Sequence, residues 1–387
     1  MWSILTSGTI FATKGDLTVT NPGRFEIRMD PAGRRRGEPE AGSRGRVRHG
    51  SSIRLADKSK NRAGTDQSLP FEKRIIELER NLAEATAEEE RRRIGQELDR
   101  EREAVFTHLT PWQRVQLARH PLRPRMLDYT SRMLEDVIEL HGDQAVGDDP
   151  AMICGIGRFR GITIAVAGQH KGVSTEEKVR RNFGMVHPEG YRKALRIFEM
   201  AERLRLPIVT FVDTPAAHPG VEAEKRGQGP AIARNLWALM RLNVPIFCAI
   251  LGEGGSGGAL GIAVGDWIAM FEHAIYVICP PERCAEILWR DAEKKELAAA
   301  ALKVTAQDLK MHGAIDVVLP EPCGGAHRDP DGAAQTLAEE LDRFLNRCRQ
   351  GEWSVEERRQ KFLRIGMWRE GEPAAEPTEA SGDAEII

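Results

Sequence analysis

A serine set among glycines is the stretch of this sequence whose residue types could do chemistry. Five glycines lie between Gly252 and Gly258, with Ser256 among them, and they follow the apolar run Val244–Leu251. This run is typical of a strand buried on both faces, and the small apolar residues after Gly258 suit a helix. We therefore expect a strand, a tight glycine turn and a helix N-terminus. The unpaired N–H groups of such a turn suit an anion, or an oxyanion that forms during a reaction.

The same stretch matches the dinucleotide fingerprint GxGxxG at Gly252–Gly257, with Glu272 at the distance expected for a ribose contact. A crossover helix and a second strand would have to fit between Gly257 and Glu272, and that space is too short. A P-loop is excluded because no Gly-Lys-Ser/Thr follows the glycines. A nucleotide site is therefore disfavoured.

The residues Gly254–Gly258 also match the nucleophile elbow GxSxG, which would make Ser256 the nucleophile of a serine hydrolase. Its catalytic partners would come from His170, His218 and Asp213. The glycines are so dense, however, that the backbone N–H groups, rather than the Ser256 hydroxyl, look like the groups that act on the substrate. The serine hydrolase stays open as the alternative to an anion-stabilising backbone.

Two further loops follow predicted strands. The segment Gly168–Gly172 leads into the basic stretch Arg180–Met185, and Asp213–Gly220 turns tightly after another strand. The carboxyl ends of parallel strands lie at one edge of a sheet, where active sites of such folds gather. We expect these two loops and the glycine turn to form three walls of one pocket.

Alternating strands and helices from Ala151 onward predict an α/β fold with a mostly parallel sheet covered by helices. The expected strands are 153–159, 162–168, 207–212, 244–251, 266–271 and 275–279. The expected helices are 188–204, 229–242, 281–301 and 305–312, preceded by a helical hairpin over 71–105, a helix that begins at Thr110 and a helix over 130–141.

Four regions follow from these patterns. We expect a disordered Arg/Gly-rich leader over 1–68, an N-terminal helical segment over 69–142, the catalytic domain over 143–350, and a C-terminal helix with a disordered acidic tail over 351–387.

The composition bounds the class of protein. The 387 residues carry a formal net charge of -2, which gives no reason to expect nucleic acid or a membrane as a partner. No apolar run approaches the about 20 residues that a membrane span needs. The six cysteines form no CxxC pair, so we expect reduced thiols in a cytoplasmic protein and no metal site.

Several long stretches carry a family resemblance: Lys178–Met185, Pro188–Arg196, Gly252–Leu260, Cys284–Trp289, Pro320–Pro322 and Gly324–Arg328. In this order, between about Leu69 and Met367, they resemble the carboxyltransferase alpha subunits of the bacterial-type, multi-subunit acetyl-coenzyme A carboxylase. The resemblance implies a crotonase-like superfold of repeated ββα units with an N-terminal α-helical segment.

The resemblance also implies an activity. The family transfers a carboxyl group from carboxybiotin, presented by a biotin carboxyl carrier protein, to acetyl-CoA, and malonyl-CoA for fatty acid synthesis is the product. A beta subunit of the family carries the zinc and most acetyl-CoA contacts. The resemblance therefore implies an α2β2 heteromer that works with biotin carboxylase and binds no metal in this chain.

By the family's motif, Gly257 and Gly258 provide N–H donors for the negative charge that develops on the biotin ureido oxygen. The pocket for carboxybiotin is expected at Gly184, Met185, Ala216, Ala217, Gly255 and Ser256. The sequence departs from the family at Ala216, where glycine is usual, and at His218, where an aromatic residue is frequent. If the turn required a positive φ at position 216, alanine would alter the shape of this loop.

Overall fold

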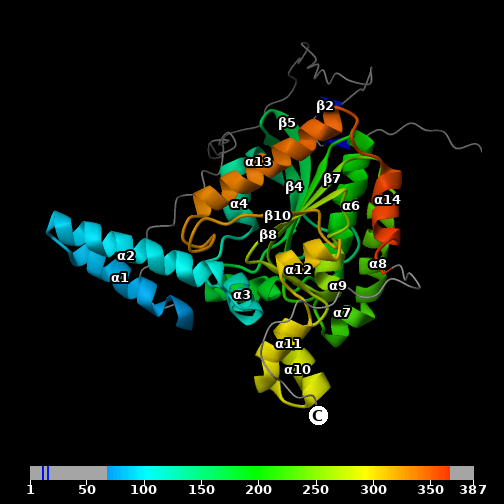
Figure 1. Ribbon diagram of the computed structural model, residues 1–387. Coiled ribbons are helices and arrows are strands. Elements are labelled where there is room, and N and C mark those ends of the chain that lie inside the picture. The colour runs from blue at the N-terminus through cyan, green and yellow to red at the C-terminus, as the bar shows by residue number, and fades with distance from the viewer. Residues whose placement is uncertain (1–10, 13–14, 17–67, 367–387) are drawn as a thin grey trace, which may run out of the picture. The chain divides into compact units, whose positions relative to one another are not determined.

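The computed structural model describes residues 11–12, 15–16 and 68–366 (Figure 1). The chain divides after Ile53 into two units. Of the first unit, the structure describes β1 (Phe11–Ala12), which pairs antiparallel with β2 (Gly15–Asp16). These four residues lie within the leader that was predicted to be disordered. The rest of the leader up to residue 67 and the tail from residue 367 lie outside the described residues, so their disorder stays a prediction.

The second unit is built on one sheet with the order β10-β8-β7-β6-β5-β4-β3, and β9 pairs with β7 beside this path. The strands from β5 to β10 pair in parallel, whereas β3, β4 and β5 pair antiparallel. Their bounds are β3 Glu135–Glu139, β4 Met152–Phe159, β5 Ile162–Gln169, β6 Ile208–Thr214, β7 Ile246–Gly255, β8 Trp267–Phe271, β9 Ile275–Val277 and β10 Val317–Leu319.

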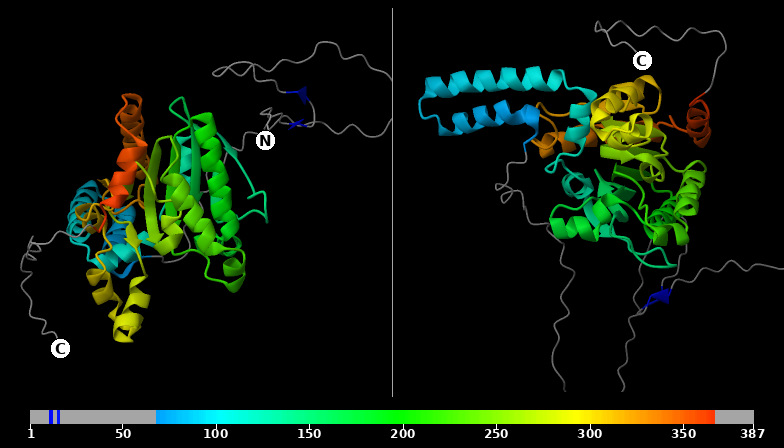
Figure 2. Two further views of the ribbon diagram at one scale, coloured as in Figure 1. Left: turned by 90° about the vertical axis from the view of Figure 1, so that its right-hand side faces the viewer. Right: turned by 90° about the horizontal axis from the view of Figure 1, so that it is seen from below.

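Helices cover both faces of this sheet (Figures 1 and 2). The α-helices of the unit are α1 Lys73–Glu84, α2 Glu88–Thr107, α3 Pro111–Ala118, α4 Met126–Met133, α5 Thr175–Arg180, α6 Pro188–Leu204, α7 Val221–Lys225, α8 Gln228–Leu239, α9 Ser256–Leu260, α10 Pro281–Trp289, α11 Lys295–Ala301, α12 Ala306–Met311, α13 Pro330–Arg349 and α14 Val355–Leu363. Short 3-10 helices are η2 Pro70–Glu72, η3 Asn182–Gly184 and η4 Ala292–Lys294.

The predicted α/β class is confirmed. Every residue of β6 and β7 is buried, as expected for central parallel strands that are apolar throughout. The β7 strand also forks, because Phe247–Ile250 pairs with β8 while Glu253–Gly255 pairs with β9. The predicted helical hairpin is present as α1 and α2, which project from the sheet in Figure 1 and in the right-hand view of Figure 2.

The helix predicted over 130–141 is wrong. The α4 helix ends at Met133, and β3 then pairs antiparallel with β4. All five residues of β3, which lies at the edge of the sheet, are exposed. The apolar residues Val137 and Ile138 resemble part of a helical stripe in the sequence, but they belong to this edge strand. Asp136, at φ 50, marks the irregular start of this pairing.

The helix predicted over 281–301 is two helices. The α10 helix ends at Trp289, its C-cap residue Arg290 adopts a left-handed φ of 54, and α11 begins at Lys295. A residue in this conformation ends a helix because its carbonyl no longer points along the axis.

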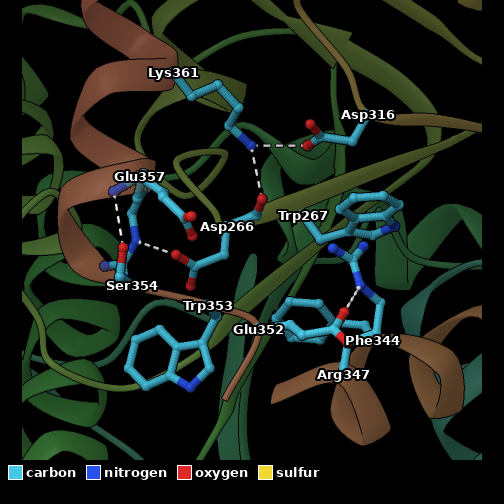
Figure 3. Close-up of a pocket in the computed structure, with 11 residues that line it drawn as sticks. Asp266, Trp267, Asp316, Phe344, Arg347, Glu352, Trp353, Ser354, Glu357 and Lys361 are labelled. Carbon is cyan, nitrogen blue, oxygen red and sulfur yellow. Dashed lines mark hydrogen bonds and ion pairs between the residues drawn. The ribbon is translucent and has the colours of Figure 1, made fainter. Parts of the chain in front are cut away.

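The α14 helix is attached to the sheet by Arg358, whose side chain is fully buried. Its guanidinium pairs with Asp266 at 2.9 Å and donates to the carbonyl oxygens of Leu239, Leu242 and Val244. One planar guanidinium therefore satisfies four acceptors around the start of β7. Nearby, the ammonium of Lys361 donates to the backbone carbonyl of Asp266 and to the carboxylate of Asp316 (Figure 3).

We expect Arg358→Lys to lower the free energy of unfolding by about 2 kcal/mol, because an ammonium cannot reach all four acceptors of the planar guanidinium. Denaturant unfolding measures the change. Arg359→Lys is the matched control, since its Nε donates to a single carbonyl and its side chain is 43% exposed; we expect a change below about 0.5 kcal/mol. Equal losses in the two variants would contradict this role of Arg358.

Candidate functional site

The glycine-rich stretch joins β7 to α9. The predicted order of strand, turn and helix is confirmed, but the turn is shorter than expected because β7 continues through Gly252, Gly254 and Gly255. The change of direction occurs at Ser256, which is exposed and has a φ of 51. Three of the five glycines therefore belong to the strand and not to the turn.

Close contacts explain these glycines. A Cβ at Gly255 would lie 1.9 Å from the carbonyl oxygen of Pro215, and one at Gly254 would lie 2.9 Å from the ring of Tyr276. A Cβ at Gly258 would lie 2.3 Å from the nitrogen of Ala217. The backbone of β7 and α9 thus packs directly on the loop after β6, and side chains are excluded from the contact.

The first turn of α9 contains the predicted oxyanion donors. The N–H groups of Gly257 and Gly258 have no acceptor within the helix, since an α-helix leaves its first N–H groups unbonded. The N-cap residue Gly255 has no side chain to accept from them. Gly257 is half-buried and Gly258 is buried, so the first of the two donor residues is partly accessible from the surface.

The structure brings the predicted pocket residues together. The hydroxyl of Thr214 lies 2.7 Å from the carbonyl oxygens of both Gly184 and Ala216, which joins the η3 segment to the loop after β6. A backbone bridge between Val186 and Ala217 continues this contact, and Met185 lies between the two joined positions. Gly255 and Gly258 contact the same loop. The segment around Gly184, the loop after β6 and the glycine stretch, which were the three expected walls, therefore lie in contact.

The two departures from the family pattern do not distort this loop. Ala216 has no positive φ, so alanine fits the turn without backbone strain. The ring of His218 stacks on His187 at a centroid distance of 4.0 Å, and its Nδ1 accepts from the N–H of Gly220. The histidine therefore fills a stacked position at the rim of the loop.

The serine hydrolase alternative lacks its catalytic partners. The backbone at Ser256 is strained as in a nucleophile elbow, but within residues 68–366 no hydrogen bond joins Ser256 to His170, His218 or Asp213. Burial, with the charge of Arg181, lowers the pKa of His170 to about 3. Such an imidazole is too weak a base to act as the general base at neutral pH.

A buried ion-pair network includes Glu253 of the glycine stretch. The network was not predicted. Lys171 contacts the carboxylates of Asp213 and Glu253 at 2.9 Å each, and Arg119 joins Glu253 at 2.7 Å to Glu282 at 2.6 Å. Burial alone would raise the pKa of Glu253, but the charges of Lys171 and Arg119 outweigh it and lower the pKa. The network ties together the ends of three neighbouring strands.

A sequence signal for this network existed. Asp213 and Glu253 are charged residues inside mostly apolar strands, and Lys171 stands two residues after the end of a third strand. Buried charges need partners of opposite sign, so these three residues were candidates for one cluster.

A second polar cluster joins η2 to the rest of the unit. The Glu72 carboxylate lies 3.1 Å from Nε2 of His327 and 3.8 Å from Nε2 of His120, and these three residues have a possible metal-ligand geometry. However, Nδ1 of His120 accepts from the N–H of Leu122, so a neutral His120 carries its proton on Nε2 and does not present a lone pair to a cation. Arg328, 3.4 Å from Glu72, already supplies positive charge. This arrangement favours an ion-pair clamp.

We expect Glu72→Gln to lower the free energy of unfolding by about 2 kcal/mol at pH 7. Burial alone would raise the pKa of Glu72, but the hydrogen bonds and charges of its partners, chiefly His327, lower it to about 2 from 4.5. A carboxylate with a lowered pKa contributes stability above its unfolded value of 4.5, and that contribution is lost as the pH falls toward 2.

Denaturant unfolding between pH 7 and pH 3 measures this effect. The difference between wild type and Glu72→Gln should shrink as the pH falls. Glu77→Gln is the control, because the carboxylate of Glu77 is half exposed in its pair with Arg74; we expect a change below about 0.5 kcal/mol. A loss for Glu72→Gln that is the same at every pH would rule out the charged clamp.

A family model described as acetyl co-enzyme A carboxylase carboxyltransferase-like matches residues 68–366. The chain belongs to this family. The resemblance inferred from the motifs is therefore confirmed, and the match spans the second unit from η2 to the end of its described residues.

Curated relatives of the acetyl-CoA carboxylase carboxyltransferase family agree. The chain is 50% identical over 313 residues to the acetyl-coenzyme A carboxylase carboxyl transferase subunit alpha of Cyanothece sp. PCC 7425, covering 78% of this chain and 96% of the relative. It is 54% identical over 276 residues to the protein of the same name from Geobacter sulfurreducens, covering 71% and 86%.

Solved structures of carboxylating enzymes are also similar. Transcarboxylase 12S has a TM-score of 0.47 at 18% identity, covering 58% of this chain and 42% of the other. The beta subunit of geranyl-CoA carboxylase from P. aeruginosa has a TM-score of 0.48 at 15% identity, covering 64% and 46%. Separately, none of the helices in the described part of this family member is long and apolar enough to cross a membrane.

Proposed function

We propose that the chain is the alpha subunit of an acetyl-CoA carboxylase carboxyltransferase, which transfers the carboxyl group of carboxybiotin to acetyl-CoA and forms malonyl-CoA. Membership of the family and the names of relatives about 50% identical support this activity. The observation that carries it is the first turn of α9, where the N–H groups of Gly257 and Gly258 have no acceptor within the helix and lie beside the loop after β6.

This donor set fits a carbonyl-type oxygen that gains negative charge. The N–H groups are held by the fold and cost little reorganisation. At Gly257 an added Cβ would meet no described heavy atom nearer than 4.0 Å, so a ligand can approach the backbone there. Carboxybiotin supplies the carboxyl group and, after its release, the basic site that removes a proton from acetyl-CoA. The chain's own task is then to bind the ureido oxygen at Gly257 and Gly258 and to shape the pocket through Gly184, Met185, Ala216, Ala217, Gly255 and Ser256.

The partners follow from the same family. We assign carboxybiotin to a biotin carboxyl carrier protein, most acetyl-CoA contacts and the zinc to a beta subunit in an α2β2 assembly, and carboxylation of biotin to a biotin carboxylase. The catalytic domain would span residues 143–350, with residues 69–142 as a helical extension. A cytoplasmic location suits such a complex.

Coexpression with the beta subunit from the same genome tests the proposal. The purified complex should decarboxylate malonyl-CoA in the presence of biocytin, the reverse of the proposed reaction, with a rate that saturates in both compounds. A folded complex without this activity would refute the proposal. A fluorophosphonate probe provides the second readout, because labelling of Ser256 together with loss of activity in Ser256→Ala would favour the serine hydrolase instead.

A further inference from the structure

The carbonyl oxygen of Gly258 accepts two hydrogen bonds from fully buried side chains. Nε2 of Gln169 donates to it at 2.7 Å, and the hydroxyl of Tyr191 donates to it at 3.0 Å. Both side chains are 0% exposed. They come from different elements, the end of β5 and the first turns of α6, so two separate parts of the fold converge on one backbone atom of α9.

The orientation of Gln169 is fixed by its second partner. Its Oε1 accepts from the N–H of Asp213 at 3.2 Å, while its Nε2 donates to Gly258. An N–H can only donate and a carbonyl can only accept, so the amide has one arrangement that satisfies both contacts. Gln169 therefore links the end of β6 to α9.

Tyr191 is a reliable donor. Burial raises the pKa of its hydroxyl far above the ordinary value, with the charge of Asp149 acting in the same direction, so the group stays neutral in the working pH range. Its ring also packs on α9, because a Cβ at Gly261 would lie 2.7 Å from Cε1 of Tyr191. The ring position is set by packing, and the hydroxyl is thereby aimed at Gly258.

These two hydrogen bonds restrain the backbone of Gly258, which has no side chain to restrain it. Any side chain here would collide with the backbone of Ala216 and Ala217, at 2.4 Å and 2.3 Å. Glycine is therefore required, but glycine is also the residue with the widest backbone freedom, and Gly257 precedes it. An oxyanion donor acts well only when its direction is fixed before the charge develops.

We infer that Gln169 and Tyr191 are positioning residues for the oxyanion donor at Gly258. They hold the Gly258 carbonyl so that the N–H of the same residue keeps its direction toward the developing charge. The inference rests on the proposed function and deepens it, since it assigns two residues outside the glycine motif to the alignment of that donor.

Tyr191→Phe and Gln169→Leu test the inference in the complex with the beta subunit. Tyr191→Phe removes one donor, and Gln169→Leu removes one donor together with the acceptor of the Asp213 N–H; both keep most of the side-chain volume. We expect kcat for biocytin-dependent malonyl-CoA decarboxylation to fall about ten- to a hundredfold in each, while KM for malonyl-CoA changes less than about twofold. Tyr129→Phe is the matched control, because that buried hydroxyl has no hydrogen-bond partner among the described residues; its kcat should equal that of wild type.

Hydrogen exchange provides a readout that does not depend on activity. Amides of the peptide over 252–264 should exchange about tenfold faster in Tyr191→Phe and Gln169→Leu than in wild type or Tyr129→Phe. Unchanged exchange, or a kcat within twofold of wild type in both variants, would overturn the positioning role. An inactive wild-type complex would refute the proposed function instead, and the exchange data would still decide whether these side chains hold Gly258.

Discussion

Gly258→Ala should lower kcat for carboxyl transfer about a thousandfold, which is the effect of losing an oxyanion donor. The added Cβ would lie 2.3 Å from the nitrogen of Ala217 and 2.4 Å from the carbonyl carbon of Ala216, and both are backbone atoms that cannot rotate away. Either α9 or the loop after β6 must move. Such a shift redirects the N–H of Gly258 and opens the contact between α9 and the loop after β6.

The neighbouring glycine provides a sharp comparison. A Cβ at Gly257 has no heavy atom nearer than Cδ1 of Ile232 at 4.0 Å, so Gly257→Ala keeps both its N–H and its backbone path. We expect it to lose no more than about tenfold in kcat. Gly95→Ala, in the projecting helix α2, meets no atom within 4 Å and should keep full activity.

These variants are assayed as complexes with the beta subunit, and thermal unfolding reports whether each remains folded. A folded Gly258→Ala complex with kcat within tenfold of wild type would show that the contact with Ala217 does not set the geometry of the donor.

Lys171→Met should lower the free energy of unfolding by about 3–5 kcal/mol at pH 7. The side chain of Lys171 is 18% exposed, and its partners Asp213 and Glu253 are 7% and 4% exposed. Removing the ammonium leaves two buried carboxylates with Arg119 as the cation on Glu253. An uncompensated buried charge costs more than the intact pair contributes.

The pH dependence of this loss identifies its cause. In wild type the lowered pKa of Glu253 means that its contribution is present above the unfolded value of 4.5 and is lost as the pH falls. In Lys171→Met the carboxylate of Glu253 loses one of the two charges that lower its pKa, so the difference from wild type should shrink below about pH 4.5.

Two further variants bound the interpretation of Lys171→Met. The double variant Lys171→Met/Asp213→Asn should recover part of the stability, because it also removes one of the stranded charges. Lys225→Met is the exposed control, since its pair with Glu222 is about two-thirds exposed; we expect a change below about 0.5 kcal/mol. A loss for Lys171→Met as small as that of the control would contradict a buried network.

The sequence predicted the parts of the site that depend on local backbone. The strand before the glycines, the helix after them and the loop ends beside them follow from apolar runs and glycine spacing. The extent of β7 could not be predicted, because glycine is permissive and the reason for Gly254 and Gly255 is contact with Tyr276 and Pro215, which lie elsewhere in the chain.

Side-chain partners across the fold were the larger omission. Gln169 and Tyr191 act on Gly258, which follows them by 89 and 67 positions, and no periodicity encodes such a contact. The edge strand β3 was mistaken for a helix for a related reason. Its neighbour β4 determines its conformation, and local propensity is a weak guide where tertiary pairing decides.

The most direct test of the central claim is the ratio of kcat between Gly258→Ala and Gly257→Ala in biocytin-dependent decarboxylation of malonyl-CoA by the complex with the beta subunit. The structure predicts a ratio of about one to a hundred, because the first variant displaces the donor and the second preserves it. Equal rates in the two variants, with wild type active, would contradict an oxyanion site at Gly258.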